Sequence, residues 1–172
     1  MTLQSIVSNW CHIYKPMLDS PKNRRFYLTD SAAGTADFAK CIKSSLSPCV
    51  LMESTVEGGG PITKITRNYP IYFFVKAKEM TSGDSATVAK EEAWLHARNF
   101  LSWLYNKHNE ELEKNISGDF SMIDLEGDIL IQSIGPIQDG WYAVLIQLDR
   151  MEPMDKCVDK NIYIEDCTDC KD

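Results

Sequence analysis

The stretch SATVAKEEAWLHARNFLSWLYNKHNEELE, residues 85–113, decides the fold of this chain. Its apolar residues recur at spacings of three and four, which predicts one long amphipathic helix. Ser82, Asp84 and Ser85 offer side-chain oxygens that would cap its first turn. Such a helix is about 40 Å long, enough to cover a whole sheet face. The residues expected on its inward face are Ala86, Ala93, Ala97, Phe100, Leu101, Leu104 and Tyr105, with Trp94 and Leu112 at the edge.

Three apolar residues fall outside this face of the helix: Val88, Leu95 and Trp103. Off-face apolar residues on a long helix indicate a second packing partner. That partner is either the N-terminal helix of the same chain or another subunit. His96 is expected on the polar side, whereas His108 is expected in the apolar stripe, where it packs or interacts with the helix dipole.

Two pairs of strand-like segments flank the helix. Alternation along the second and fourth segments predicts that one face of each lies under the helix. The opposite faces are also apolar, because they carry Tyr72, Phe74, Trp141 and Leu145, so short helices or another chain should cover them. The first pair is 49–56 and 62–78, separated by the glycine run 58–60. The second pair is 128–137 and 141–149, separated by a turn at 138–140. The residues expected under the helix are Ile71, Phe73, Val75 and Ala77 of the second segment and Tyr142, Val144, Ile146 and Leu148 of the fourth.

The N-terminal part predicts two short helices, residues 2–14 and 35–46, with a brief strand at 25–29 between them. Another short strand is expected at 120–125, and Pro70 indicates a bulge or an edge position. The predicted fold class is α+β. An antiparallel sheet of about four to five strands, arranged as two hairpins, is covered by one long helix, with two short N-terminal helices and a C-terminal arm.

Charge separates the chain into a domain and an extension. The chain carries 18 basic and 25 acidic residues, a net charge of −7. Residues 1–150 are expected to form a single domain, and 151–172 an acidic C-terminal extension with seven acids and three lysines. Within it, 161–165 could add as a strand to a sheet edge. Because acidic residues outnumber basic ones, the sequence does not predict the basic surface that sequence-specific nucleic-acid binders have.

Neither a membrane span nor a secretion signal is expected. No apolar run approaches the roughly 18 residues that cross a bilayer, and the first residues lack a basic segment followed by an apolar one. An intracellular location is therefore expected, and the six cysteines are expected to be free thiols.

No residue pattern predicts catalysis, a cofactor or a metal site. Cys167 and Cys170 have zinc-ligand spacing, but only Cys157 is near as a third ligand and structural zinc needs four. Cys11 and His12 are adjacent on a helix and point apart. The glycine run 58–60 precedes strand-like residues, so it does not predict a phosphate loop. The remaining candidates, Asp124, Glu126 and Asp128, indicate a solvated acidic turn rather than a cation site.

The chain resembles the tail terminator and tail-completion proteins of long-tailed bacteriophages over roughly 35–152. The residues that carry the resemblance are PCVLMES (48–54), NYPIYFFVKAKE (68–79), ATVAKEEAWLHARNFLSWL (86–104) and GDILIQSIGPIQDGWYAVLIQLD (127–149). It implies a non-enzymatic structural protein that assembles as a ring, commonly a hexamer, at the tail end or head–tail junction. Its partners would be copies of itself and tail tube or connector proteins. It would act in the host cytoplasm during assembly and then in the virion.

A ring subunit needs apolar surface outside its own core. The candidate interface residues are Tyr72, Phe74, Val88, Leu95, Trp103, Trp141, Ile162, Tyr163 and Ile164. A net acidic channel would let DNA pass without binding it. Two other hypotheses stay open: a small ligand-binding module with an apolar cavity between helix and sheet, and a metal-dependent or thiol protein that uses Cys157, Cys167 and Cys170.

Overall fold

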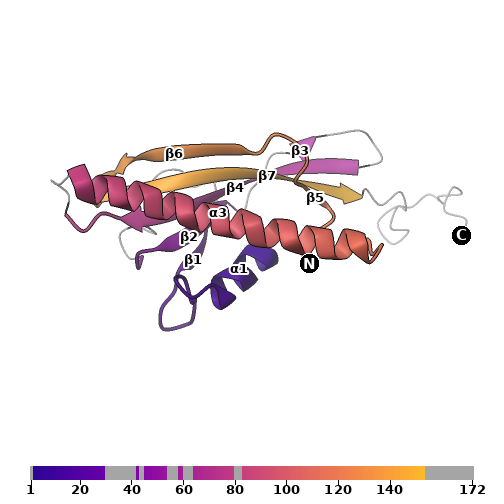
Figure 1. Cartoon of the computed structure of the whole chain (residues 1–172), viewed down its shortest axis with the longest axis horizontal. Helices are drawn as coiled ribbons and strands as arrows, with labels where there is room; N and C mark the ends of the chain where they lie inside the picture. The colour runs from indigo at the N-terminus through magenta and orange to yellow at the C-terminus, as the bar shows by residue number, and fades with distance from the viewer. Residues whose placement is uncertain are drawn as a thin grey trace, which may run out of the picture.

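The computed structural model describes residues 2–29, 42, 45–53, 58–59, 64–79 and 83–153. Figure 1 shows a long helix lying along one face of a sheet, with a short helix beside it. The fold is α+β, as the sequence predicts. The helices are α1 (Leu3–Ile13) and α3 (Gly83–Glu113), and the strands are β1 (Phe26–Thr29), β2 (Cys49–Glu53), β3 (Gly58–Gly59), β4 (Lys64–Lys76), β5 (Ile123–Asp124), β6 (Leu130–Ile137) and β7 (Trp141–Pro153).

The sheet is mixed and larger than the expected four to five antiparallel strands. Among the described residues it has seven strands in the order β1-β2-β4-β7-β5, with β3 on β4 and β6 on β7. The expected pairings of β2 with β4 and of β6 with β7 are confirmed. However, β4 and β7 also pair with each other along their whole length, so the two hairpins form one sheet. β1 runs parallel to β2, which requires a crossover connection that strand periodicity does not reveal.

The glycine run behaves differently from the expected turn. Gly58 and Gly59 form β3 and pair with Arg67 and Thr66 of β4. On the same side of β4, the pairing with β2 stops at Ile71, directly after Pro70. Pro70 therefore lies between the two short ladders, at an edge position that tolerates a residue without an N–H group.

The main core lies between the sheet and the two helices, and it confirms the predicted strand faces. The inward residues of β4 and β7 pack in one cluster with α1 and α3. Trp10 of α1 joins the layers, since its ring stacks on Tyr14 and meets Phe73 and Phe100 edge-on at 5.9 and 5.2 Å. Thr2 caps α1 by accepting a hydrogen bond from the Ser5 amide. Burial of these rings stabilises the contact between the helices and the sheet.

The buried face of α3 is rotated from the predicted one. Tyr105 and Leu112 are 55% and 49% exposed, whereas Ala89 and His96 are 2% and 3% exposed. The expectation that His96 lies on the polar side was wrong, because α1 packs against that side of α3 and brings Tyr14 to it. His108 is buried as expected, and its Nδ1 lies 3.0 Å from the carbonyl oxygen of Phe120.

The other face of the sheet carries a second apolar cluster. Phe74 and Trp141 are 0% and 2% exposed there, packed with Cys49, Leu51 and Ala143. Ile42, a helical residue, is buried in the same cluster. The rest of the expected helix 35–46 lies largely outside the described residues, although Leu46 is described, is not helical and is exposed.

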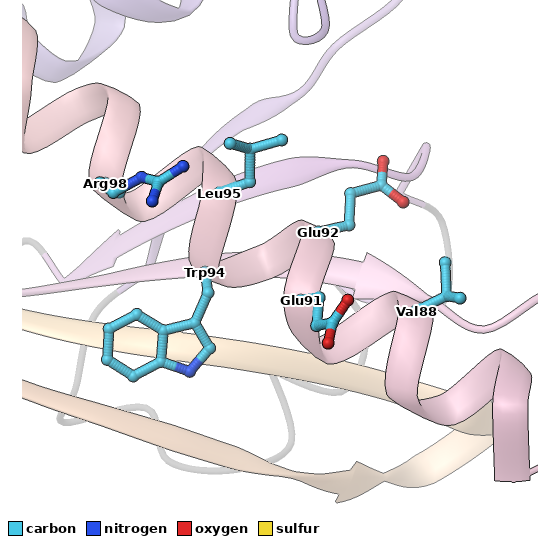
Figure 2. Close-up of a pocket in the computed structure, with 6 residues that line it drawn as sticks. All are labelled: Val88, Glu91, Glu92, Trp94, Leu95 and Arg98. Carbon is cyan, nitrogen blue, oxygen red and sulfur yellow. The ribbon is translucent and has the colours of Figure 1, made fainter.

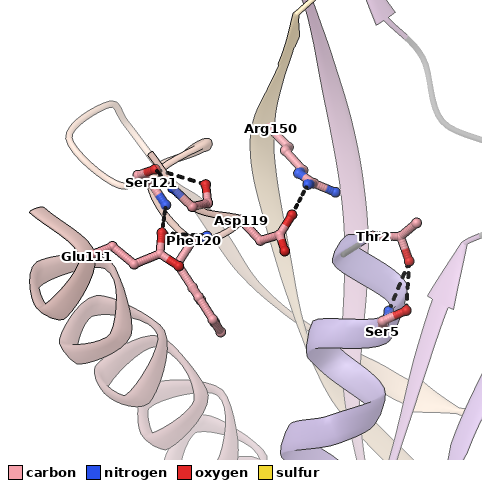
Figure 3. Close-up of polar contacts among 8 residues, drawn as sticks. Thr2, Ser5, Glu111, Asp119, Phe120, Ser121 and Arg150 are labelled. Atoms are coloured by element: carbon pink, nitrogen blue, oxygen red, sulfur yellow. Dashed lines mark hydrogen bonds and ion pairs between the residues drawn. The ribbon is translucent and has the colours of Figure 1, made fainter. Parts of the chain in front are cut away.

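Two carboxylates, those of Glu111 and Asp119, hold the segment after α3 in place through hydrogen bonds and an ion pair (Figure 3). Glu111 Oε2 accepts hydrogen bonds from the amides of Phe120 and Ser121 at 3.0 and 2.8 Å. Asp119 pairs with Arg150 of β7 at 3.3 Å. The strand expected at 120–125 is shorter, with only the two residues of β5, because these contacts hold its first half as turns.

Candidate interaction surface

Two of the three apolar residues that the sequence places outside the inward face of α3, Val88 and Leu95, lie on its solvent side. Val88 is 60% exposed and Leu95 43% exposed, and both face away from the core cluster. They line an open pocket of about 600 Å³ on this helix. Figure 2 shows its six lining residues projecting from α3, with Leu95 and Trp94 on opposite sides of the ribbon. We call this set the outer face of α3: Val88, Glu91, Glu92, Trp94, Leu95 and Arg98.

Charged residues on the outer face lie on both sides of Leu95 along the helix. Glu91 precedes it by one turn and Arg98 follows it by one turn. The two are seven positions apart, about 10 Å along the axis, too far for a direct ion pair. Within the described part of the chain, neither the Glu91 carboxylate nor the Arg98 guanidinium forms a hydrogen bond or an ion pair. The outer face therefore combines an apolar centre with two opposite charges that lack partners.

A second, smaller pocket continues this surface toward the start of α3. Its volume is about 340 Å³, and it shares Val88 and Glu92 with the first pocket. The Glu79 amide donates to Ser85 Oγ at 3.0 Å, which fixes the approach of the chain to the helix. The other lining residues are Lys76, Ala77, Lys78, Glu79, Asp84, Ser85 and Ala89. The two pockets adjoin at Val88 and Glu92, and together we call them the groove.

The two tryptophans of α3 differ in their surroundings. Trp94 Nε1 donates to Ser133 Oγ of β6 at 2.6 Å, and its ring is 40% exposed. Trp103, expected to point away from the core, is instead half-buried and packs against Phe100 and Phe120. Its partner is the loop after α3, a contact between distant residues that helix periodicity does not reveal. The Trp103 ring therefore packs against residues of its own chain.

The candidates on the far face of the sheet are also engaged within the chain. Phe74 and Trp141 are buried in the second apolar cluster, where Ile42 also packs, so their own chain covers these two residues, which is one of the two alternatives that the sequence left open for this face. Tyr72 is half-buried beside Phe74, and its hydroxyl donates to Glu53 Oε1 at 2.9 Å. Burial raises the pKa of Tyr72, and the bond to Glu53 raises it further.

A polar network links α1 to α3 beside the groove. The Tyr14 hydroxyl accepts a hydrogen bond from Asn99 Nδ2 at 2.9 Å and lies 3.0 Å from His96 Nδ1. The other ring nitrogen of His96 is buried 3.5 Å from Glu92 Oε1 and has no hydrogen-bond partner among the described residues. Burial lowers the pKa of His96, and the Glu92 carboxylate opposes part of that shift. The neutral ring therefore joins the two helices.

The described cysteines and histidines do not form a reactive pair. Cys11 and Cys49 are buried and neither is part of a disulfide bond. Burial strongly raises the pKa of Cys11, which keeps it protonated and unreactive. His12 is exposed and contacts the Ser8 carbonyl and Asp19.

The described residues contain no group of three or more His, Cys, Asp or Glu side chains placed to hold a metal ion. The acidic residues around Gly127 form the expected turn, because Asp124 Oδ1 accepts from the amides of Glu126 and Gly127. The candidates Cys157, Cys167, Cys170, Ile162, Tyr163 and Ile164 lie outside the described residues.

Comparison with known proteins adds no family assignment. No protein-family model matches the chain, and no curated protein matches its sequence significantly. Within the described ranges, no helix is long and apolar enough to cross a membrane. The residues that sequence reasoning missed are Glu91 and Arg98, whose signal was the seven-residue spacing around Leu95.

Proposed function

We propose that this chain is a non-enzymatic structural virion protein, a subunit of an oligomeric ring at a phage tail end or head–tail junction. The observation that carries the proposal is the outer face of α3, where Val88 and Leu95 are exposed between unpaired charges. A contact surface of this kind serves association rather than chemistry. The pattern resemblance to tail terminator proteins supplies the ring and its location.

The net negative charge of the chain also supports this proposal. The chain has a net charge of −7, so a channel formed by several copies would repel DNA phosphates. DNA could then pass through the ring without binding to it. Tail tube and connector proteins are the expected neighbours of such a ring, besides further copies of the chain.

Self-association is the property to measure first. Size-exclusion chromatography with light scattering, over a range of protein concentrations, should give a mass of several subunits that increases with concentration. Electron microscopy of the largest species should then reveal closed rings. A single-subunit mass at the highest concentration, with and without a tail tube protein, would argue against the proposal.

The alternative, a small ligand-binding module, requires an apolar cavity between the long helix and the sheet. The residues at that contact give it no support, because Ala93, Ala97 and Phe100 are at most 1% exposed and pack directly in the main core. The open groove lies on the solvent side of α3 instead. The thiol or metal hypothesis depends on cysteines outside the described residues.

A further inference from the structure

We propose that the outer face of α3 binds the same face of a second copy, with the two helices antiparallel and Glu91 of each copy paired with Arg98 of the other. The inference rests on the proposed self-association and names the surface and geometry of one of its contacts.

The charge pattern selects the second copy as the occupant. Glu91 and Arg98 lie on either side of Leu95 along the helix and have no partners in the described ranges of the chain. A twofold axis near Leu95 brings each Glu91 to the opposite Arg98, so one surface satisfies both charges twice. A different protein would need a basic residue placed opposite Glu91 and an acidic residue placed opposite Arg98.

The orientation follows from the same residues. In a parallel, in-register pair, Glu91 would face Glu91 and Arg98 would face Arg98, and like charges in contact are unfavourable. In the antiparallel pair the charges are complementary, and Leu95, near the twofold axis, lies against Leu95 of the second copy. Leu95 is 43% exposed and so has apolar surface left to bury. The contact thus has an apolar centre with ion pairs on either side, as protein interfaces commonly do.

This contact uses the same surface on both copies, so it joins two copies and leaves no free surface of this kind for a third. A ring of more than two copies needs a second, different contact, so the outer face of α3 would pair subunits within or between rings. Loss of this contact therefore leaves smaller assemblies and does not by itself abolish the ring.

Charge reversal tests the pairing directly. Glu91→Arg gives a copy with arginines at both positions, and Arg98→Glu gives a copy with two glutamates. Each variant alone should dissociate at about tenfold higher concentration than the wild type, or higher still, because both contacts become repulsive. An equimolar mixture of the two variants should form mixed pairs with wild-type affinity, because every contact is again complementary. The double variant Glu91→Arg/Arg98→Glu should also associate like the wild type.

Analytical ultracentrifugation of each variant measures these affinities, and circular dichroism checks that each one folds. Glu126→Arg makes the same charge change at an exposed turn away from α3 and should leave association unchanged. If the wild type associates but the single variants do so equally well, this contact is wrong while the proposed function stands. Weakened single variants that fail to rescue each other also overturn the antiparallel pairing. A monomeric wild type at all concentrations overturns both proposals.

Discussion

The hydroxyl of Tyr14, the C-cap residue of α1, lies 3.0 Å from Nδ1 of His96 in α3, and this contact joins the two helices that cover the sheet. Asn99 donates to the same hydroxyl at 2.9 Å. Burial lowers the pKa of His96, so its ring is neutral at neutral pH. The contact therefore couples the docking of α1 to the protonation of one buried side chain.

Stability should fall as the pH decreases below neutrality. Burial holds the pKa of His96 below its ordinary value of 6.5, so the unfolded chain binds a proton that the folded chain does not. The stabilising contribution is complete above pH 6.5 and is lost as the pH falls toward the folded-state pKa. Urea unfolding between about pH 7.5 and 5.5 measures this slope. His96→Gln should reduce the slope, and an equal slope in His96→Gln would exclude this histidine as its source.

Removing the Tyr14 hydroxyl should destabilise the contact between α1 and α3. Tyr14→Phe leaves Asn99 Nδ2 and His96 Nδ1 without their present partner in a partly buried site. We expect a loss of about 1–2 kcal/mol in the free energy of unfolding. Tyr105→Phe is the control, because Tyr105 lies on α3, the helix that carries Asn99 and His96, and is 55% exposed. Equal effects of the two changes would contradict a specific role for the Tyr14 hydroxyl.

Glu111 should stabilise the segment that follows α3. Glu111→Ala removes the acceptor of two backbone amides, those of Phe120 and Ser121, and we expect a cost of about 2 kcal/mol. Glu113→Ala removes an exposed carboxylate from the same end of the helix and should change stability by less than about 0.5 kcal/mol. Hydrogen exchange of the Phe120 and Ser121 amides should be faster only in the Glu111 variant. Unchanged protection there would show that these bonds do not hold the segment.

The inner and outer faces of α3 should separate stability from association. Phe100→Ala removes a fully buried ring from the main core and should cost about 3–5 kcal/mol. Leu95→Ala removes a side chain that is 43% exposed and should cost less than about 1 kcal/mol in the isolated subunit. Sedimentation should nevertheless detect weaker self-association of Leu95→Ala. A large loss of subunit stability in Leu95→Ala would mean that Leu95 belongs to the core.

Local patterns predicted the elements well and their contacts less well. The spacing of apolar residues predicted the limits of α1 and α3 and the faces of β4 and β7 that lie under the helix. The turn residues predicted the pairing of β2 with β4 and of β6 with β7. The exposure of Val88 and Leu95 also follows from period alone. Trp103 and His96 were placed on the wrong side because their partners, Phe120 and Tyr14, approach from distant parts of the chain.

The sequence by itself determined the class of fold, because a helix 31 residues long and alternating strands can bury their apolar faces only against each other. The tertiary structure alone decided the mixed sheet order and the parallel pairing of β1 with β2, since strand order depends on crossovers rather than on local pattern. It also decided which apolar residues remain for a partner. Phe74 and Trp141 are enclosed by their own chain, whereas Val88 and Leu95 stay on the solvent side of α3.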